Sequence, residues 1–358
     1  MASRKAPFRY GKQKTYKVMW MIQAALVVNV IASTVLYTLA GYDGPRLLLS
    51  ASLAVVVGVV TEFVFYLSWK RPKSIVYLML HKQAAMVPLM VALLLPLHAP
   101  LYLVAVSTVV AVWIGKLVFG GFGNSIFQNA TVGVLFAYVS FAPQLALTPA
   151  LIGQGLFYPI DVLKQALFNN VLSGLDMTAL FLGTEYYTIA TGAMSGLVLV
   201  GIWIVLSVTK TIDWIVGATY VASVFAISTI VGGPELGVEM VLTGIVLFAA
   251  VFLVSDPITS PTTRNTKLLY AVSVAVVTVM IRILGNNTEG VLFAILIGNV
   301  ITPYMNRNAR SGTLRTFIQT AAIAIVITVA SGVVLLQTRQ PAIEELSTTM
   351  EVWIDETL

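Results

Sequence analysis

The sequence predicts an all-α integral membrane protein, because the chain is strongly apolar, carries regularly recurring apolar runs and places its cationic residues between them. Of its 358 residues, 58% are hydrophobic and only 10% are charged, and the mean hydropathy is +0.91. This composition is far too apolar for a soluble globular domain. Because a hydrocarbon core about 30 Å thick needs about 20 residues per helix, the chain has room for about ten or eleven spans and little else.

Apolar runs mark the expected transmembrane helices. Three of them, 84–97, 126–141 and 290–301, are shorter than a bilayer requires. We expect those three helices to be tilted, extended through polar flanks or broken. The expected spans are 18–39, 47–67, 84–97, 101–118, 126–141, 188–208, 212–231, 238–254, 268–284, 290–301 and 317–336.

Cationic loops predict the orientation of the chain, because Lys and Arg are retained on the cytoplasmic side. If the basic segment 1–17 is cytoplasmic, the segment 142–187 and the acidic tail 337–358 lie outside. We therefore expect a multi-pass protein of a prokaryotic cytoplasmic membrane, embedded in the lipid bilayer. The net charge of +6 is explained by this topology and does not indicate a nucleic-acid partner. The loop cations that this alternation places in the cytoplasm are Lys70, Arg71, Lys73, Lys116, Lys210, Arg264, Lys267, Arg307, Arg310 and Arg315.

The chain contains no Cys and only two His. It can form no disulfide and can supply neither a thiolate zinc site nor Cys ligands for an iron–sulfur cluster, and two His are too few for a multi-histidine haem site. We expect no metal site, so a redox role would require an organic cofactor.

An internal repeat is indicated by the pentapeptide Gly-Val-Leu-Phe-Ala, which occurs at 133–137 and again at 290–294. In the predicted topology the first copy runs outward and the second inward, as in a pair of inverted five-helix repeats. The two repeats would occupy 18–141 and 188–336. In such folds the substrate or ion site lies near the midplane, where interrupted helices of the two halves meet.

Two predicted helix breaks combine polar residues with unusual backbone. In the segment 115–130, glycines that include Gly120 and Gly121 allow positive φ and close approach, and the next helix offers free N–H groups. In the segment 255–263, Asp256 and several hydroxyls stand beside two prolines that leave backbone carbonyls free. The alternative interpretations are a tight turn within the bundle for the first break and a solvated cytoplasmic turn for the second.

Together the breaks resemble one family, the D subunit of the Rnf complex and the B subunit of the sodium-translocating NADH:quinone oxidoreductase. Asp-Pro-Ile-Thr at 256–259, the following Thr262-Thr263, the stretch 289–294 and then 299–303 match the order and spacing of the family. At the first break Phe127 matches the family pattern, whereas its Asn and Pro are replaced. The resemblance covers most of the chain. The expected fold, two inverted five-helix repeats, is similar to that of urea channels.

The resemblance implies a subunit that holds flavin, with one FMN joined through its phosphate to a Thr on the outer side and a second flavin, FMN or riboflavin, within the bundle. Its partners would be membrane and peripheral subunits that carry iron–sulfur clusters and flavin, because this chain would not be a complete enzyme alone. No residue is assigned a catalytic role. The residues implied to contact cofactor are Gly120, Gly121, Phe127, Thr178, Asp256, Thr259, Thr262, Thr263 and Arg282.

Thr178 is the candidate acceptor for the outer FMN. The attachment pattern of the family is Asp, two residues, Ser or Thr, one residue, Ala, Thr, Pro, Leu, and the nearest stretch here is 173–180. If Thr178 is the acceptor, Met177 and Ala179 replace the Ala and the Pro. If Ser173-Gly174 anchors the alignment instead, Asp176 takes the place of the Thr. Covalent flavin, non-covalent flavin and a plain hydroxyl in an interfacial turn all stay open.

Ionisable residues at membrane depth are candidates for function, because a charge in lipid is costly. Glu62 and Asp256 are candidates for an ion pathway, and the alternative for Glu62 is snorkelling toward the cytoplasmic edge. Arg282 is expected either to pair with a flavin phosphate or to snorkel. Glu239 and Asp213 are expected to be ordinary interface residues near helix ends.

Two functions from different classes follow from these observations. In the first, the chain is a subunit of a redox complex that passes electrons through bound flavin while the complex moves Na⁺ or H⁺. In the second, it is a channel or transporter for a small polar solute, since inverted five-helix repeats also build urea channels. The visible absorption spectrum of the purified protein distinguishes the two.

Overall fold

The computed structural model describes residues 15–69, 83–121, 123–145, 177–183, 190–284, 290–307, 318–320, 322–335 and 337. Every regular element within these residues is a helix, which confirms the all-α prediction. Five described helices are long and apolar enough to cross a membrane: α1 (Thr15–Leu39), α2 (Gly44–Trp69), α12 (Trp214–Leu242), α14 (Arg264–Leu284) and the final helix, Ile318–Leu335.

Shorter helices complete two halves of the chain. Those of the first half are α4 (Met86–Leu94), α5 (Leu101–Val110), η1 (Ala111–Leu117), α6 (Asn129–Ser140) and α7 (Ala142–Leu145). Those of the second half are α10 (Met177–Leu182), η2 (Thr191–Ala193), α11 (Gly196–Val208), α13 (Val246–Phe248), η3 (Ala249–Leu253) and α15 (Gly290–Arg307). Two of these elements, η1 and η3, are π-helical turns.

The outer surface of the bundle is apolar, as expected of a protein surrounded by lipid. On α2, Val56, Val60 and Val64 are 60%, 53% and 54% exposed and recur every four residues, so they form one stripe on the helix. The opposite face of the same helix buries Ala54 and Glu62 completely. A soluble protein would not expose such a stripe on helix after helix, which supports the membrane assignment.

Several helices are broken inside the bundle. Within α12, Gly232 and Gly233 leave helical geometry, and Gly233 has φ +90°, which glycine adopts most readily. Pro234 follows and starts a second helical piece that ends at Leu242. The single span expected over 238–254 is therefore wrong: the chain is extended at Thr243 and resumes as the short pair α13 and η3.

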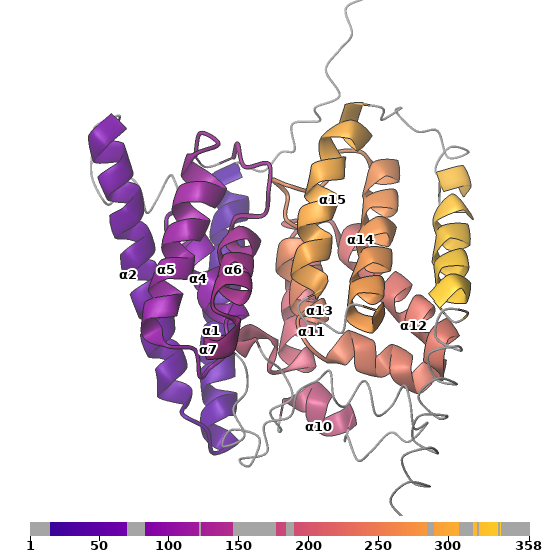
Figure 1. Ribbon diagram of the computed structural model, residues 1–358, viewed down its shortest axis with the longest axis horizontal. Helices are drawn as coiled ribbons and strands as arrows, with labels where there is room; N and C mark the ends of the chain where they lie inside the picture. The colour runs from indigo at the N-terminus through magenta and orange to yellow at the C-terminus, as the bar shows by residue number, and fades with distance from the viewer. Residues whose placement is uncertain are drawn as a thin grey trace, which may run out of the picture.

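The two halves stand side by side (Figure 1). Helices α1, α2, α4, α5 and α6 gather on the left of the view and α11 to α15 on the right. Contacts of α6 with α15 and of α1 with α11 join the halves. Helix α6 runs downward toward α7, whereas α15 runs upward (Figure 1), and these opposite directions agree with the predicted inverted repeat.

A short segment of the second half inserts into the first and fixes the junction. Asn29 in α1 donates its side-chain amide to the Gly192 carbonyl at 3.0 Å, and the Thr191 hydroxyl donates to the Ala92 carbonyl at 3.0 Å. A Cβ on Gly192 would lie 2.8 Å from Leu93 Cβ and 2.9 Å from the ring of Phe248. The junction between α4 and α13 is therefore packed so closely that only glycine fits.

Candidate functional site

The Gly-rich break joins η1 to α6. Gly120, Gly121 and Gly123 all have positive φ, between +88° and +104°, so the chain turns in a conformation that other residues rarely adopt. A Cβ on Gly121 would lie 2.7 Å from the Tyr66 hydroxyl. Phe127 packs edge to face on Phe119, with ring centroids 6.0 Å apart. The break is therefore tightly folded against α2.

The helix that follows this break is capped by a side chain. Gln128 Oε1 accepts from the Thr131 backbone N–H at 3.2 Å, and Gln128 Nε2 donates to Met90 Sδ at 3.4 Å. One of the free N–H groups that the sequence predicts at the start of α6 is thus already satisfied within the protein. An anion there would have to compete with this cap.

A buried ion pair lies next to the first break. Lys116 Nζ donates to Glu62 Oε2 at 2.9 Å, and the two side chains are 1% and 0% exposed. Snorkelling of Glu62 is therefore wrong, and so is the assignment of Lys116 to the cytoplasmic loop cations. Glu62 Oε1 has no hydrogen-bond partner in the part of the chain that the structure describes.

The Asp-Pro break follows η3 and closes on itself. Asp256 is buried, with Oδ1 accepting from the Ile258 N–H at 3.4 Å and Oδ2 accepting from the Thr259 hydroxyl at 3.1 Å. Burial raises the pKa of Asp256 to about 6, although hydrogen bonds from Ile258 and Thr259 lower it. The solvated-turn interpretation is therefore wrong for Asp256 and Thr259, which are both buried.

The two threonines that end this break differ in their surroundings. Thr262 is exposed, and its N–H donates to Asn306 Oδ1 at 3.0 Å, which ties the break to the end of α15. Thr263 is half-buried, stands just before α14, and its hydroxyl lies 2.8 Å from that of Thr266. These contacts position the start of α14.

A buried polar pair lies near the Asp-Pro break. The Tyr270 hydroxyl donates to Asn299 Oδ1 at 3.2 Å, and both residues are fully buried. Asp256 is close enough to Tyr270 to act on it electrostatically. Asn299 Nδ2 is buried and has no hydrogen-bond partner among the described residues, so this amide has two donors to offer.

A second buried acid and base lie at the end of α12. Arg282 is 2% exposed and donates to the Met240 carbonyl at 2.7 Å and to the Thr243 hydroxyl at 2.9 Å. Glu239 is fully buried, so its assignment as an ordinary interface residue is wrong, and Arg282 does not snorkel. Asp213 does behave as an interface residue, because it is 34% exposed and pairs with Lys267 at 2.8 Å.

The predicted flavin acceptor lies far from the two breaks. Thr178 is exposed on α10, which packs against the start of α11, where the Ser195 hydroxyl donates to the Phe181 carbonyl at 3.3 Å. Helix α10 is at the lower end of the bundle in Figure 1, whereas both breaks are at the upper end. Residues 171–176, which carry the rest of the attachment pattern, lie outside the described residues.

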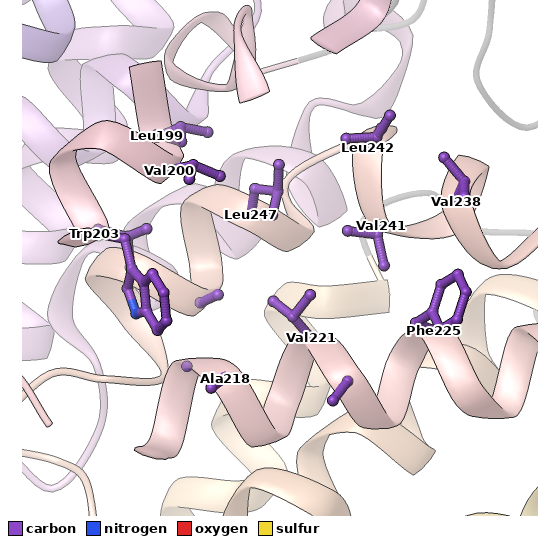
Figure 2. Close-up of a pocket in the computed structure, with 14 residues that line it drawn as sticks. Leu199, Val200, Trp203, Ala218, Val221, Phe225, Val238, Val241, Leu242 and Leu247 are labelled. Carbon is purple, nitrogen blue, oxygen red and sulfur yellow. The ribbon is translucent and has the colours of Figure 1, made fainter. Parts of the chain in front are cut away.

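The sequence did not predict a cavity of about 400 Å³ between α11, the two parts of α12, and α13 with η3. Figure 2 shows apolar side chains from these helices around it, among them Leu199, Val221, Phe225 and Leu247. The indole N–H of Trp203 is buried without a hydrogen-bond partner among the described residues. None of the predicted site residues lines this cavity, and its walls are suited to hydrocarbon and not to a polar ring edge.

Comparisons with known proteins agree with the resemblance. The model of the NQR2, RnfD, RnfE family matches residues 2–315. The D subunit of an ion-translocating oxidoreductase complex from Salmonella arizonae is 24% identical over 347 residues, which cover 85% of this chain and 96% of the relative. Proteins of the same name from Haemophilus influenzae and Escherichia coli are 25% and 23% identical, over 84% and 85% of this chain and 93% and 96% of the relatives.

Proposed function

Because the chain belongs to the NQR2, RnfD, RnfE family, we propose that it is the membrane subunit of an ion-translocating oxidoreductase complex. The observation that carries the proposal is the family match over residues 2–315, which includes both helix breaks and both buried acid–base groups. The relatives are all named as the D subunit of such a complex and are matched over more than nine-tenths of their length. The comparisons favour this role over the channel for a small polar solute.

We further propose that the subunit works with flavin. An exposed hydroxyl such as that of Thr178 is accessible for a phosphoester bond, and its surface location suits an outer FMN. Near the Asp-Pro break, Asn299 Nδ2 and the neighbouring hydroxyls are groups of the kind that bind the polar edge of a flavin ring. A bound flavin would supply one-electron transfer, which none of the side chains of this Cys-free chain supplies at ordinary potentials.

The residues of the chain would contribute position and electrostatics. Asp256 and Thr259 hold the break in one conformation, and Thr262 binds it to the end of α15. Lys116 and Glu62 place a compensated pair of charges beside the first break. Other subunits would deliver and accept the electrons, and the bilayer would separate the compartments between which Na⁺ or H⁺ moves. We place the chain in a prokaryotic cytoplasmic membrane with its N-terminus inside.

The visible absorption spectrum of the chain purified in detergent, together with the mass of its Thr178 peptide, tests this proposal. We expect the bands of oxidised flavin and an FMN adduct on Thr178 that Thr178→Ala removes. Thr320→Ala, a half-buried threonine near the start of the final helix, is the matched control and should keep the adduct. Flavin absorption bands without an adduct on Thr178 would mean that the flavin is bound non-covalently. A colourless, correctly folded preparation that conducts a small solute in vesicles would refute the electron-transfer role.

A further inference from the structure

The two halves place an acid and a base at corresponding positions. In each half a short helix is followed by two prolines four residues apart, Pro96 and Pro100 after α4 and Pro257 and Pro261 after η3. The long helix before each short helix carries a buried glutamate near its end, Glu62 in α2 and Glu239 in α12. The helix after the prolines carries a buried base near its own end, Lys116 in η1 and Arg282 in α14.

The two corresponding groups differ in how the base is used. In the first half, Lys116 donates directly to Glu62. In the second half, Arg282 donates instead to the Met240 carbonyl and to the Thr243 hydroxyl. The Thr243 hydroxyl in turn donates to the Glu239 carbonyl at 2.7 Å, so backbone and hydroxyl oxygens at the end of α12 take the place of the carboxylate.

This arrangement leaves the Glu239 side chain without a hydrogen bond from the part of the chain that the structure describes. Both of its carboxyl oxygens are buried, and neither has a hydrogen-bond partner among the described residues. An ionised carboxylate in such a place would cost several kcal/mol, whereas the protonated acid is tolerated far better. Because burying the ionised group without partners is so expensive, its state should depend on whether a proton or a cation is present.

From these contacts we propose that Glu239 is a reversible proton-binding site in the membrane interior. Arg282 is the charged group of the described structure that faces it, and Arg282 also acts on Tyr220, whose hydroxyl is 3.2 Å from that of Thr278. Arg282 acts electrostatically on Glu239, and when Glu239 loses its proton we expect the guanidinium to turn from the end of α12 toward the carboxylate. The second half would then adopt the ion pair that Lys116 and Glu62 already form.

A proton suits this site better than a metal cation. Two oxygens at the same end of α12, the Met240 carbonyl and the Thr243 hydroxyl, already accept hydrogen bonds from Arg282. The positive guanidinium would repel a second cation, and an alkali ion that gives up its water needs several oxygens at once. The inference rests on the proposed ion-translocating role for its purpose and on the described geometry for its chemistry.

Labelling with dicyclohexylcarbodiimide, which reacts with protonated carboxyl groups in apolar surroundings, tests the site in the wild-type complex. Mass spectrometry should find the adduct on Glu239 and not on Glu62, whose carboxylate is held in the ion pair with Lys116. Above the midpoint, labelling should fall about tenfold for each further unit of pH. Glu239→Gln should abolish the adduct, and Glu235→Gln, an exposed position on the same helix, should leave it unchanged.

Three outcomes would overturn the inference: no adduct on Glu239, equal labelling of Glu62, or labelling that Na⁺ blocks at constant pH. The last would make Glu239 a cation site. The test does not depend on flavin, so it can fail while the purified complex keeps its flavin spectrum. Conversely, a colourless complex whose Glu239 is labelled as expected would refute the redox role and leave the proton site standing.

Discussion

Replacing Lys116 by Met should lower the free energy of unfolding by about 3–5 kcal/mol, because it leaves Glu62 as an uncompensated charge in the bundle. The pair is almost completely buried and its atoms are 2.9 Å apart. At an effective dielectric constant of about 20, the Coulomb attraction over 2.9 Å is about 6 kcal/mol. Burying both charges offsets part of this attraction, but the single variant loses all of it and keeps one buried charge.

Equilibrium unfolding in detergent micelles, followed by tryptophan fluorescence, measures this loss. The double variant Lys116→Met with Glu62→Gln should recover to within about 1 kcal/mol of the wild type, because no charge is left unpaired. Lys267→Met is the matched control, since it breaks the partly exposed pair with Asp213 and should cost less than about 1 kcal/mol. Equal losses for Lys116→Met and Lys267→Met would refute the reasoning.

Two further predictions concern the junction and the Asp-Pro break. Gly192→Val should cost about 1–3 kcal/mol in the same unfolding measurement, because its side chain would press on α4 and α13; Gly201→Ala, with no atom within 4 Å of its added Cβ, should change stability by less than about 0.5 kcal/mol. Asp256 has its pKa raised from 3.8 to about 6, so the folded state binds this proton more tightly than the unfolded state. The stability that protonated Asp256 contributes is fully present below the pKa of the unfolded state and is lost as pH rises through about 6. Asp256→Asn should therefore remove that part of the pH dependence of the unfolding midpoint. An unfolding midpoint with the same pH dependence in Asp256→Asn and the wild type would contradict the assignment.

Composition and local pattern were enough to predict the fold class and most helix positions. The apolar runs correspond to described helices because lipid imposes length and hydrophobicity on each segment separately. The Gly232-Gly233-Pro234 break signal lies between the expected spans 212–231 and 238–254, but the second break, at Thr243, was missed because an apolar run hides where its backbone turns. The ion pair of Glu62 with Lys116 joins residues far apart in sequence, so only the packing of α2 against η1 reveals it.

The candidate sites were harder to predict because the role of a buried polar residue depends on which groups it faces in the folded protein. Glu239 looks like a residue near a helix end, and its isolation becomes visible only when Arg282 is seen bound to the end of α12. The apolar cavity has no sequence signature, since its walls come from helices that are ordinary when taken singly. Thr178 is exposed on α10, and both its location on the outer side of the membrane and its bond to flavin stay predictions.

The π-helical turn η1 determines which way Lys116 points. Val118 N–H donates to the Trp113 carbonyl five residues back, at 3.0 Å, so this turn holds one residue more than an α-helical turn. Each residue of an α-helix advances the side-chain direction by about 100°, so deleting one residue from 111–115 would rotate every following side chain, including that of Lys116, by that angle. Lys116 would then leave Glu62 and take the place of Gly115, where a Cβ lies only 3.0 Å from the Asn129 carbonyl oxygen. The extra residue of this turn thus sets the helix angle at which Lys116 meets its counter-charge on the neighbouring helix.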